Sequence, residues 1–290
     1  MAMYPWIDYG GRFSPLRATV FAALFLPGIY TAVLLGLGWL GARPVTEAIH
    51  NMGLWTIRLV FIALAITPAR QILGWRRLIE VRRMVGVAAF VYILIHFTLY
   101  IVDEAFDLGT VASEIVLRIY LTIGFTALVG LGTLTATSTE GMVRRLGRRW
   151  QRLHNLIHPI AILCLIHFFM QSKADVWEPT WMSGLYAWLV GWRVLDRWTK
   201  RGQTMPLWRL AALGIAACML TALGEAAYWW VMRGVPVMRV LDSNFTTFLG
   251  VRPSWIVLGA GLVAVLAAAV RRLIPSPSPA RNRASAARGV

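Results

Sequence analysis

The sequence predicts an all-α protein, a polytopic bundle of transmembrane helices. Of its 290 residues, 58% are hydrophobic, only 14% are charged, and the mean hydropathy is +0.62. A soluble domain is nearer half apolar and a quarter charged. The apolar residues also fall in long runs, with the charged residues clustered between them. A membrane-spanning helix needs roughly 20 apolar residues, and runs of about this length recur along the chain.

Eight segments are apolar enough to be candidate membrane helices. The first exceeds the apolar core of a cleavable signal peptide, so we expect a retained helix. The sixth is the shortest and is interrupted by charge. The segments are 18–40, 54–72, 84–103, 117–138, 153–171, 182–195, 209–231 and 254–271.

The loops between these segments alternate in charge. Those around Arg76, Arg148 and Lys200 are basic, whereas those around Asp103 and Asp175 are acidic. Basic loops stay in the cytoplasm, so the net charge of +16 reflects topology, and we expect no nucleic-acid partner. The basic face should instead attract anionic membrane lipid. We therefore expect a multi-pass protein of the bacterial inner membrane with its N-terminus in the cytoplasm.

Histidines are the candidate functional residues, because ionisable groups inside a membrane span are costly. With a rise of about 1.5 Å per residue, His96 lies roughly 18 Å and His167 roughly 21 Å from the cytoplasmic ends of their segments. The two therefore lie at similar depths on helices that run in the same direction. Imidazoles so placed can ligate one haem iron axially. Each could equally hydrogen-bond a neighbouring helix.

Further candidates lie towards the cytoplasmic face. His154 lies 13 residues before His167, which is roughly 140° around an ideal helix, unless a kink at Pro159 realigns the two. His158 could be a second ligand, a partner of a haem propionate, or without a role. Arginine forks suit the anionic propionates, although each arginine could also be an interfacial anchor. The candidate arginines are Arg82 and Arg83, which flank the cytoplasmic end of the segment 84–103, and, on the opposite periplasmic side, Arg118, which opens the segment 117–138.

Several segments resemble the MsrQ family, formerly YedZ, within the ferric-reductase-like transmembrane superfamily. The resemblance covers roughly residues 20–195 and rests on four motifs in order. The motifs are Ile66-Thr-Pro-Ala-Arg70, Arg82-Arg-Met-Val-Gly86 with His96, Arg118-Ile-Tyr-Leu-Thr122, and Leu146-Gly-Arg-Arg-Trp-Gln-Arg-Leu-His154 with His167.

The resemblance implies an electron-transfer subunit of an oxidoreductase system rather than its catalytic subunit. MsrQ-like proteins carry haem b, one or two groups, and FMN is also implied. Their electron donor is the membrane quinone pool or a cytosolic flavin reductase. Their acceptor is an MsrP-like periplasmic molybdoenzyme that reduces methionine sulfoxide in oxidised proteins. By the match, His96, His154 and His167 are the haem-associated histidines.

The chain then divides into four parts. We expect a cytoplasmic segment at 1–17, a six-helix haem-binding core at 18–203, an additional helix pair at 204–274, and a disordered tail at 275–290 that is rich in Pro, Ser, Ala and Arg. Two alternatives for the function remain open at this point. One is a transmembrane ferric or cupric reductase, and the other is a haem-free membrane anchor or transporter.

Overall fold

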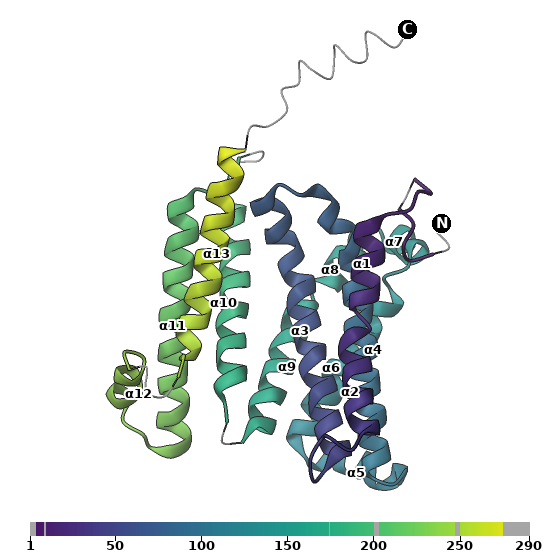
Figure 1. The fold of residues 1–290 in the computed structure, drawn as a ribbon. Coiled ribbons are helices and arrows are strands. Elements are labelled where there is room, and N and C mark those ends of the chain that lie inside the picture. The colour runs from purple at the N-terminus through teal and green to yellow at the C-terminus, as the bar shows by residue number, and fades with distance from the viewer. Residues whose placement is uncertain (1–3, 9, 174, 200–202, 247–249, 275–290) are drawn as a thin grey trace.

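The computed structural model describes residues 4–8, 10–173, 175–199, 203–246 and 250–274, so the predicted tail 275–290 lies outside the described residues. Within the described part, every regular element is a helix (Figure 1), and the predicted all-α polytopic bundle is confirmed. Seven helical segments are long and apolar enough to cross a membrane. They are Pro15–Gly36, Pro44–Leu73, Arg76–Asp103, Ile119–Ala136, Arg148–Ser172, Leu207–Arg233 and Pro253–Leu273.

The first predicted segment is two helices, α1 (Pro15–Ala23) and α2 (Leu26–Gly36). Proline follows Leu26 and lacks the amide hydrogen that a continuous helix would use. Tyr92 joins the two ends, because its hydroxyl donates to the carbonyl of Leu24 at 2.7 Å and accepts from the amide of Gly28 at 2.9 Å. The two helices therefore lie against the core as one span.

The next two helices form a long antiparallel pair. The first, α3 (Pro44–Leu73), begins ten residues before the predicted 54–72, because Pro44 fits the first turn of a helix. It ends at Gly74, whose φ of 65° is the left-handed conformation that glycine adopts most easily. A short 3-10 turn, η1 (Arg76–Leu78), leads into α4 (Ile79–Asp103).

The predicted helix 153–171 is broken near its N-terminal end. Its two parts are α8 (Arg148–His154) and α9 (Ile157–Ser172). Pro159 has no amide hydrogen for the carbonyl of Asn155, which instead accepts from the amide of His158 at 3.1 Å. The elements before this break are α5 (Leu108–Leu117), α6 (Ile119–Ala136) and α7 (Glu140–Leu146).

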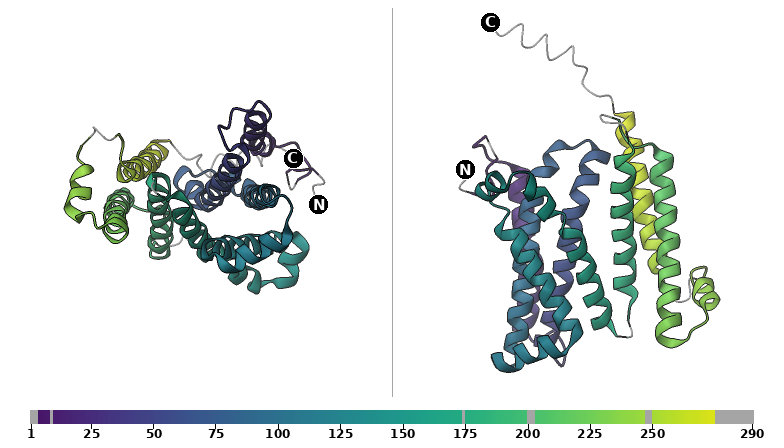
Figure 2. Two further views of the ribbon diagram at one scale, coloured as in Figure 1. Left: turned by 90° about the horizontal axis from the view of Figure 1, so that it is seen from below. Right: turned by 180° about the vertical axis from the view of Figure 1, so that it is seen from behind.

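The predicted sixth segment, 182–195, lies inside α10 (Trp177–Arg197). This helix has 21 residues and is long enough to cross a membrane, but it is not among the seven apolar spans of the described residues, because its side chains are less apolar on average. It lies between α9 and the last helices of the chain (Figures 1 and 2). Those last helices are α11 (Leu207–Arg233), α12 (Val237–Ser243) and α13 (Pro253–Leu273).

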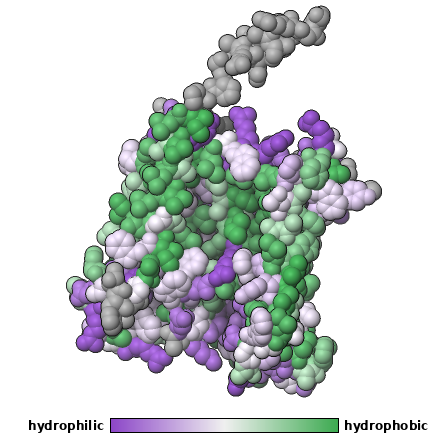
Figure 3. Space-filling view, viewed as in Figure 1, coloured by the Kyte–Doolittle hydropathy of each residue, from purple (hydrophilic) through white to green (hydrophobic). Residues whose placement is uncertain are grey.

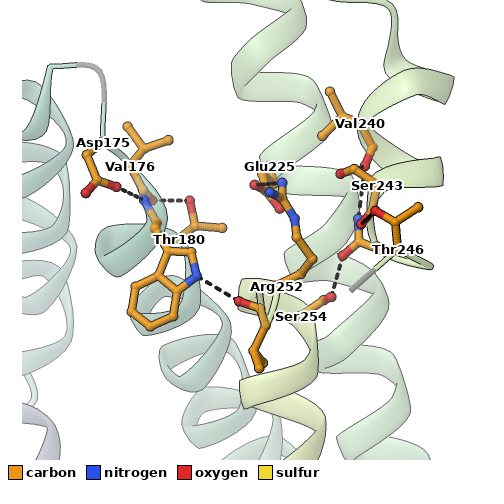
Figure 4. A network of polar contacts seen from close by, with 12 residues as sticks. Asp175, Val176, Thr180, Glu225, Val240, Ser243, Thr246, Arg252 and Ser254 are labelled. Carbon is orange, nitrogen blue, oxygen red and sulfur yellow. Dashed lines mark hydrogen bonds and ion pairs between the residues drawn. The ribbon is translucent and has the colours of Figure 1, made fainter. Parts of the chain in front are cut away.

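The additional pair, α11 and α13, packs closely against itself and against α10. A Cβ on Gly261 would lie 2.8 Å from the Cα of Gly214, so the two backbones touch. At the end of the pair near α12, the buried carboxylate of Glu225 forms an ion pair with Arg252 (Figure 4). The indole of Trp177 on α10 donates to the carbonyl of Val251 at 2.9 Å. The first two contacts hold the pair together, and the hydrogen bond from Trp177 joins it to α10.

The two ends of the bundle differ from its flank. Apolar side chains cover much of the flank, and polar side chains gather at both ends (Figure 3). The start of α1, the helices α7 and α8, and the end of α13 lie at one end, while α5 and α12 lie at the other (Figure 1). The basic residues around Arg76 and Arg148 are therefore together at the end that carries both α1 and the end of α13.

Candidate functional site

The structure brings His96 and His167 together. His96 is on α4 and His167 is on α9, and both side chains are partly buried. Their ring centroids are 6.3 Å apart, and the ring planes are nearly perpendicular at 89°. Two helices far apart in the sequence thus present facing imidazoles at one depth.

Each imidazole is held by the same pair of contacts. Nδ1 of His96 lies 2.7 Å from the carbonyl of Ile49, and Nδ1 of His167 lies 2.8 Å from the carbonyl of Tyr120. A carbonyl can only accept, so each Nδ1 carries the proton and each Nε2 keeps its lone pair. Neither Nε2 has a hydrogen-bond partner among the described residues. This is the arrangement in which a histidine is oriented to ligate a metal.

A glycine lies under each ring. A Cβ on Gly53 would lie 3.0 Å from Nδ1 of His96, and a Cβ on Gly124 would lie 2.8 Å from Nδ1 of His167. Any other residue would push the imidazole away from the carbonyl that orients it. Glycine is therefore required at both positions by close approach, although it weakens a helix by about 1 kcal/mol relative to alanine.

The separation of the rings fits one metal ion between them. Each imidazole nitrogen lies roughly 2.0 Å from a metal that it ligates and roughly 1.1 Å from the centre of its own ring. Two imidazoles on opposite sides of one metal therefore have ring centres about 6.2 Å apart. The observed 6.3 Å agrees with this sum. The described residues contain no group of three or more His, Cys, Asp or Glu that could hold a metal. Two imidazoles without further side-chain ligands suit a haem, whose porphyrin supplies the other four nitrogens.

A cavity of 680 Å³ surrounds the two imidazoles. Apolar side chains such as Ile93, Phe97 and Phe125 line its inner part, as in many cofactor sites. Carboxylates gather at its rim, together with one arginine. The charged residues that line it are Glu47, Glu104, Glu114, Arg118, Asp175 and Glu178.

Arg118 is the one candidate arginine that lines this cavity. Its side chain forms an ion pair with Glu114 at 2.5 Å and donates to the hydroxyl of Tyr120 at 3.1 Å. The hydrogen bond to Tyr120 raises the pKa of the guanidinium, so Arg118 stays cationic. It is half-exposed and can turn towards an anionic group in the cavity.

His154 does not line the cavity. Nε2 of His154 lies 3.2 Å from the hydroxyl of Thr137, and its ring stacks on Trp150 with centroids 3.9 Å apart. Trp150 in turn donates its indole N–H to the carbonyl of Thr137 at 2.9 Å. The break between α8 and α9 leaves His154 near the basic end of the bundle, roughly 20 Å of helix from His167. The kink therefore does not bring the two histidines into one cavity.

The other candidates also lie at the basic end. His158 contacts Tyr186 of α10, whose hydroxyl donates to the backbone carbonyl of His158 at 3.0 Å. Arg82 lies within electrostatic reach of both His154 and His158. Arg83 is exposed. Both arginines are on α4, about 20 Å of helix from His96, so neither serves the cavity of His96 and His167.

The glycines and carbonyls that hold the histidines are functional residues that sequence reasoning missed. The sequence does carry a signal for them, because Leu-Ile-His-Phe occurs at both 94–97 and 165–168. In both cases the glycine under the ring precedes its histidine by 43 residues, and the residue whose carbonyl accepts from Nδ1 precedes it by 47 residues. His50, in a predicted loop, is in α3 and lines the cavity.

Comparison with known proteins gives relatives of one kind. The profile of the family described as ferric reductase like transmembrane component matches residues 52–165. The protein-methionine-sulfoxide reductase heme-binding subunit MsrQ of Xanthomonas campestris pv. campestris strain 8004 is 48% identical over 192 residues, which are 65% of this chain and 88% of the relative. MsrQ of Rhodospirillum rubrum is 40% identical over 187 residues, which are 64% of this chain and 90% of the relative. No solved structure matches the chain.

Proposed function

Since the chain belongs to the MsrQ family of haem-binding subunits, we propose that it is a b-type cytochrome that carries electrons across the bacterial inner membrane. Its acceptor is an MsrP-like molybdoenzyme in the periplasm that reduces methionine sulfoxide in oxidised proteins. Its donor is the membrane quinone pool or a cytosolic flavin reductase. The chain itself transforms no substrate and acts as the electron-transfer subunit.

The facing imidazoles carry this proposal. His96 and His167 would hold one haem b through their Nε2 atoms, while the carbonyls of Ile49 and Tyr120 hold the Nδ1 protons. A haem held by both imidazoles would supply one-electron transfer rather than oxygen chemistry. Arg118, which lines the cavity, would bind a propionate of that haem. The apolar inner lining keeps water away and so sets the haem potential.

A second group lies nearer the basic end of the bundle. Arg82 and Arg193 lie within electrostatic reach of each other there, and neither has an ion-pair partner among the described residues. Arg193 donates to the backbone carbonyls of Leu64 and Leu189, which leaves its charge without a counter-ion, and two cations without carboxylates favour an anionic ligand. The propionates of a second haem beside His154 or the phosphate of FMN would supply that charge. Such a group would receive the electrons that the His96 and His167 site passes on.

The charge of the two ends supports the orientation. The basic end faces the cytoplasm and anionic lipid, so the N-terminus is cytoplasmic and the rim of the 680 Å³ cavity faces the periplasm. An electron then leaves from the cavity nearest the acceptor. Two groups at different depths divide the ~30 Å hydrocarbon core into shorter steps.

The alternative function is a transmembrane ferric or cupric reductase, which the ferric reductase profile and the acidic rim favour. Carboxylates at a cavity mouth concentrate cations. Reduction of ferric or cupric chelates by the pre-reduced protein, without any added molybdoenzyme, would favour this alternative. Reduction only of an added MsrP-like partner would favour electron transfer to the repair system.

The first experiment is a dithionite-reduced minus oxidised visible spectrum of the purified protein, with His96→Ala and His167→Ala beside it. We expect a b-type signal that falls by about the same amount in both variants, because they remove the two ligands of one iron. Phe169→Ala, near His167 on α9, is the control that should keep the signal. A wild type without any haem signal would refute the cytochrome, and unchanged signals in both variants would refute this ligand pair.

A further inference from the structure

A second pocket, of 350 Å³, lies at the end of the additional helix pair that is near α12. Its walls come from the start of α10, the end of α11, α12 and the start of α13. Glu225 and Arg252 lie between Asp175, just before α10, and Ser243 of α12 (Figure 4). Among the described residues, Asp175 alone lines both this pocket and the histidine cavity. The pocket is therefore a neighbouring site that the proposed electron transfer does not use.

A buried ion pair forms part of the pocket wall. The side chain of Glu225 is only 5% exposed and that of Arg252 is 16% exposed. The pair joins Oε1 of Glu225 to a terminal nitrogen of Arg252. Oε2 of Glu225 and Nε of Arg252 are both buried without a hydrogen-bond partner among the described residues. Unpartnered buried polar atoms cost free energy, so this wall favours a ligand that brings one donor and one acceptor.

The rim of the pocket carries one further charge of each sign. Asp175 and Arg239 both line the pocket and are exposed, and neither has an ion-pair partner among the described residues. The lining thus has two carboxylates and two guanidinium groups, whose charges cancel. A ligand with a net charge would leave one charge of this partly buried site without a counter-ion. The electrostatics therefore favour a ligand that carries both signs and is neutral overall.

The remaining wall of the pocket is apolar. It is made by two tryptophans and three valines, which are Trp177, Trp229, Val176, Val235 and Val240. Two further polar groups of the lining are already paired. The indole of Trp177 donates to the carbonyl of Val251 at 2.9 Å, and the hydroxyl of Ser243 donates to the carbonyl of Val240 at 2.6 Å. A sugar, whose many hydroxyls each need a partner, would find few here, whereas an apolar side chain suits this wall.

We propose that this pocket binds a free α-amino acid with an apolar side chain. Its ammonium group meets the carboxylates of Glu225 and Asp175, and its carboxylate meets the guanidinium groups of Arg252 and Arg239. Its side chain lies along the tryptophans and valines. The volume of 350 Å³ is near the lower limit of the roughly 300–1,000 Å³ of small-molecule pockets, as a ligand of this size requires.

The proposal gives the additional helices a role beyond the proposed function. Seven of the ten lining residues come from α11, α12 and the residue that caps α13 or the loop between α11 and α12. Since α12 lies at the end of the bundle opposite α1, the pocket faces the periplasm in the orientation proposed above. Binding of the ammonium group at Asp175 would also neutralise one carboxylate on the rim of the histidine cavity.

The test measures binding directly by isothermal titration calorimetry of the purified full chain in detergent. The probes are L-leucine, L-methionine and L-phenylalanine, followed by the N-acetyl and methyl-ester derivatives of the one that binds most tightly. Each derivative lacks one of the two charges, and D-glucose is the sugar probe. The rim variants Asp175→Asn and Arg239→Gln leave the buried ion pair intact. The matched controls are Asp242→Asn on α12 and Arg233→Gln on α11, exposed charges that do not line the pocket.

We expect at least one of the three amino acids to bind, and each blocked derivative to bind about tenfold more weakly or worse, because it loses charge-assisted hydrogen bonds. The rim variants should weaken binding by about two- to fivefold, as exposed ion pairs do, and the controls should not change it. A pocket that binds none of the three amino acids, and so holds only water, would overturn the proposal. Equal binding of the blocked derivatives or of glucose, or unchanged binding in both rim variants, would overturn it too. The binding needs no haem, so a preparation without haem would fail the proposed function alone.

Discussion

Replacing Gly124 by alanine perturbs the haem site without touching a ligand. The added Cβ would lie 2.8 Å from both Nδ1 and Cε1 of His167. Ordinary contacts of a Cβ begin near 3.4 Å, so the imidazole must move by about 0.6 Å. A shift of this size exceeds the roughly 0.5 Å tolerance of a metal site and lengthens the hydrogen bond to Tyr120.

The magnitude follows from two opposed effects. Overpacking in a well-packed interior costs typically 1–3 kcal/mol, and loss of an outer-shell partner lowers metal affinity by about 10–100-fold. The change from glycine to alanine in a helix returns up to about 1 kcal/mol of stability. We therefore expect Gly124→Ala to fold with a stability loss of at most about 2 kcal/mol and to lose haem. Gly53→Ala should do the same more weakly, because its Cβ would lie 3.0 Å from His96.

The assay is the ratio of haem to protein, from the pyridine haemochrome spectrum, with the midpoint potential of the remaining haem. The control is Gly86→Ala on α4, the helix of His96, where an added Cβ meets nothing within 4 Å. We expect haem loss in the order Gly124→Ala, then Gly53→Ala, then Gly86→Ala. Full haem occupancy and an unshifted potential in Gly124→Ala would refute the close-approach reasoning.

Three further predictions concern other parts of the molecule. His154→Ala should leave the haem of His96 and His167 in place and remove at most a second group; haem-to-protein ratios test this, and loss of all haem would contradict it. Gly261→Ala should lower stability by about 1–3 kcal/mol, because its Cβ would meet the backbone of α11, whereas Gly259→Ala on the same helix has open space; thermal unfolding compares them, and equal midpoints would contradict the packing. Asp107 caps α5, and its hydrogen bond from the amide of Thr110 lowers its carboxyl pKa. The stability that Asp107 contributes is therefore present above the usual aspartate pKa and is lost as pH falls through the lowered value. Asp107→Ala should lower the melting midpoint at pH 7 but not at a pH below the lowered value. An equal difference between variant and wild type at both pH values would contradict this.

The apolar runs predicted most helices because their length must match the bilayer. The seven apolar spans overlap seven of the eight predicted segments. Boundaries moved where local chemistry outweighed hydropathy, as at Pro44, which begins α3 ahead of its apolar run. Pro159 indicated the break after His154 in the sequence, but the sequence did not indicate how far α8 and α9 would diverge.

The histidines were found from their depth, and the partners that hold them were not. Depth depends only on counting residues along a helix, so His96 and His167 could be matched before the structure was known. Rotation about the helix axes and the distance between helices depend on packing. These decide that Gly53 and Gly124 lie under the rings and that Arg118 lines the cavity.

The sequence by itself determined that this chain is a helical membrane protein of the MsrQ kind, because hydropathy and motif order are properties of the chain alone. The tertiary structure alone decided that two imidazoles 6.3 Å apart share one cavity while His154 is separate. It also decided that Arg58 on α3 forms an ion pair with Glu178 on α10, which lines that cavity. Residues more than a hundred positions apart meet there, and no local pattern encodes such a meeting.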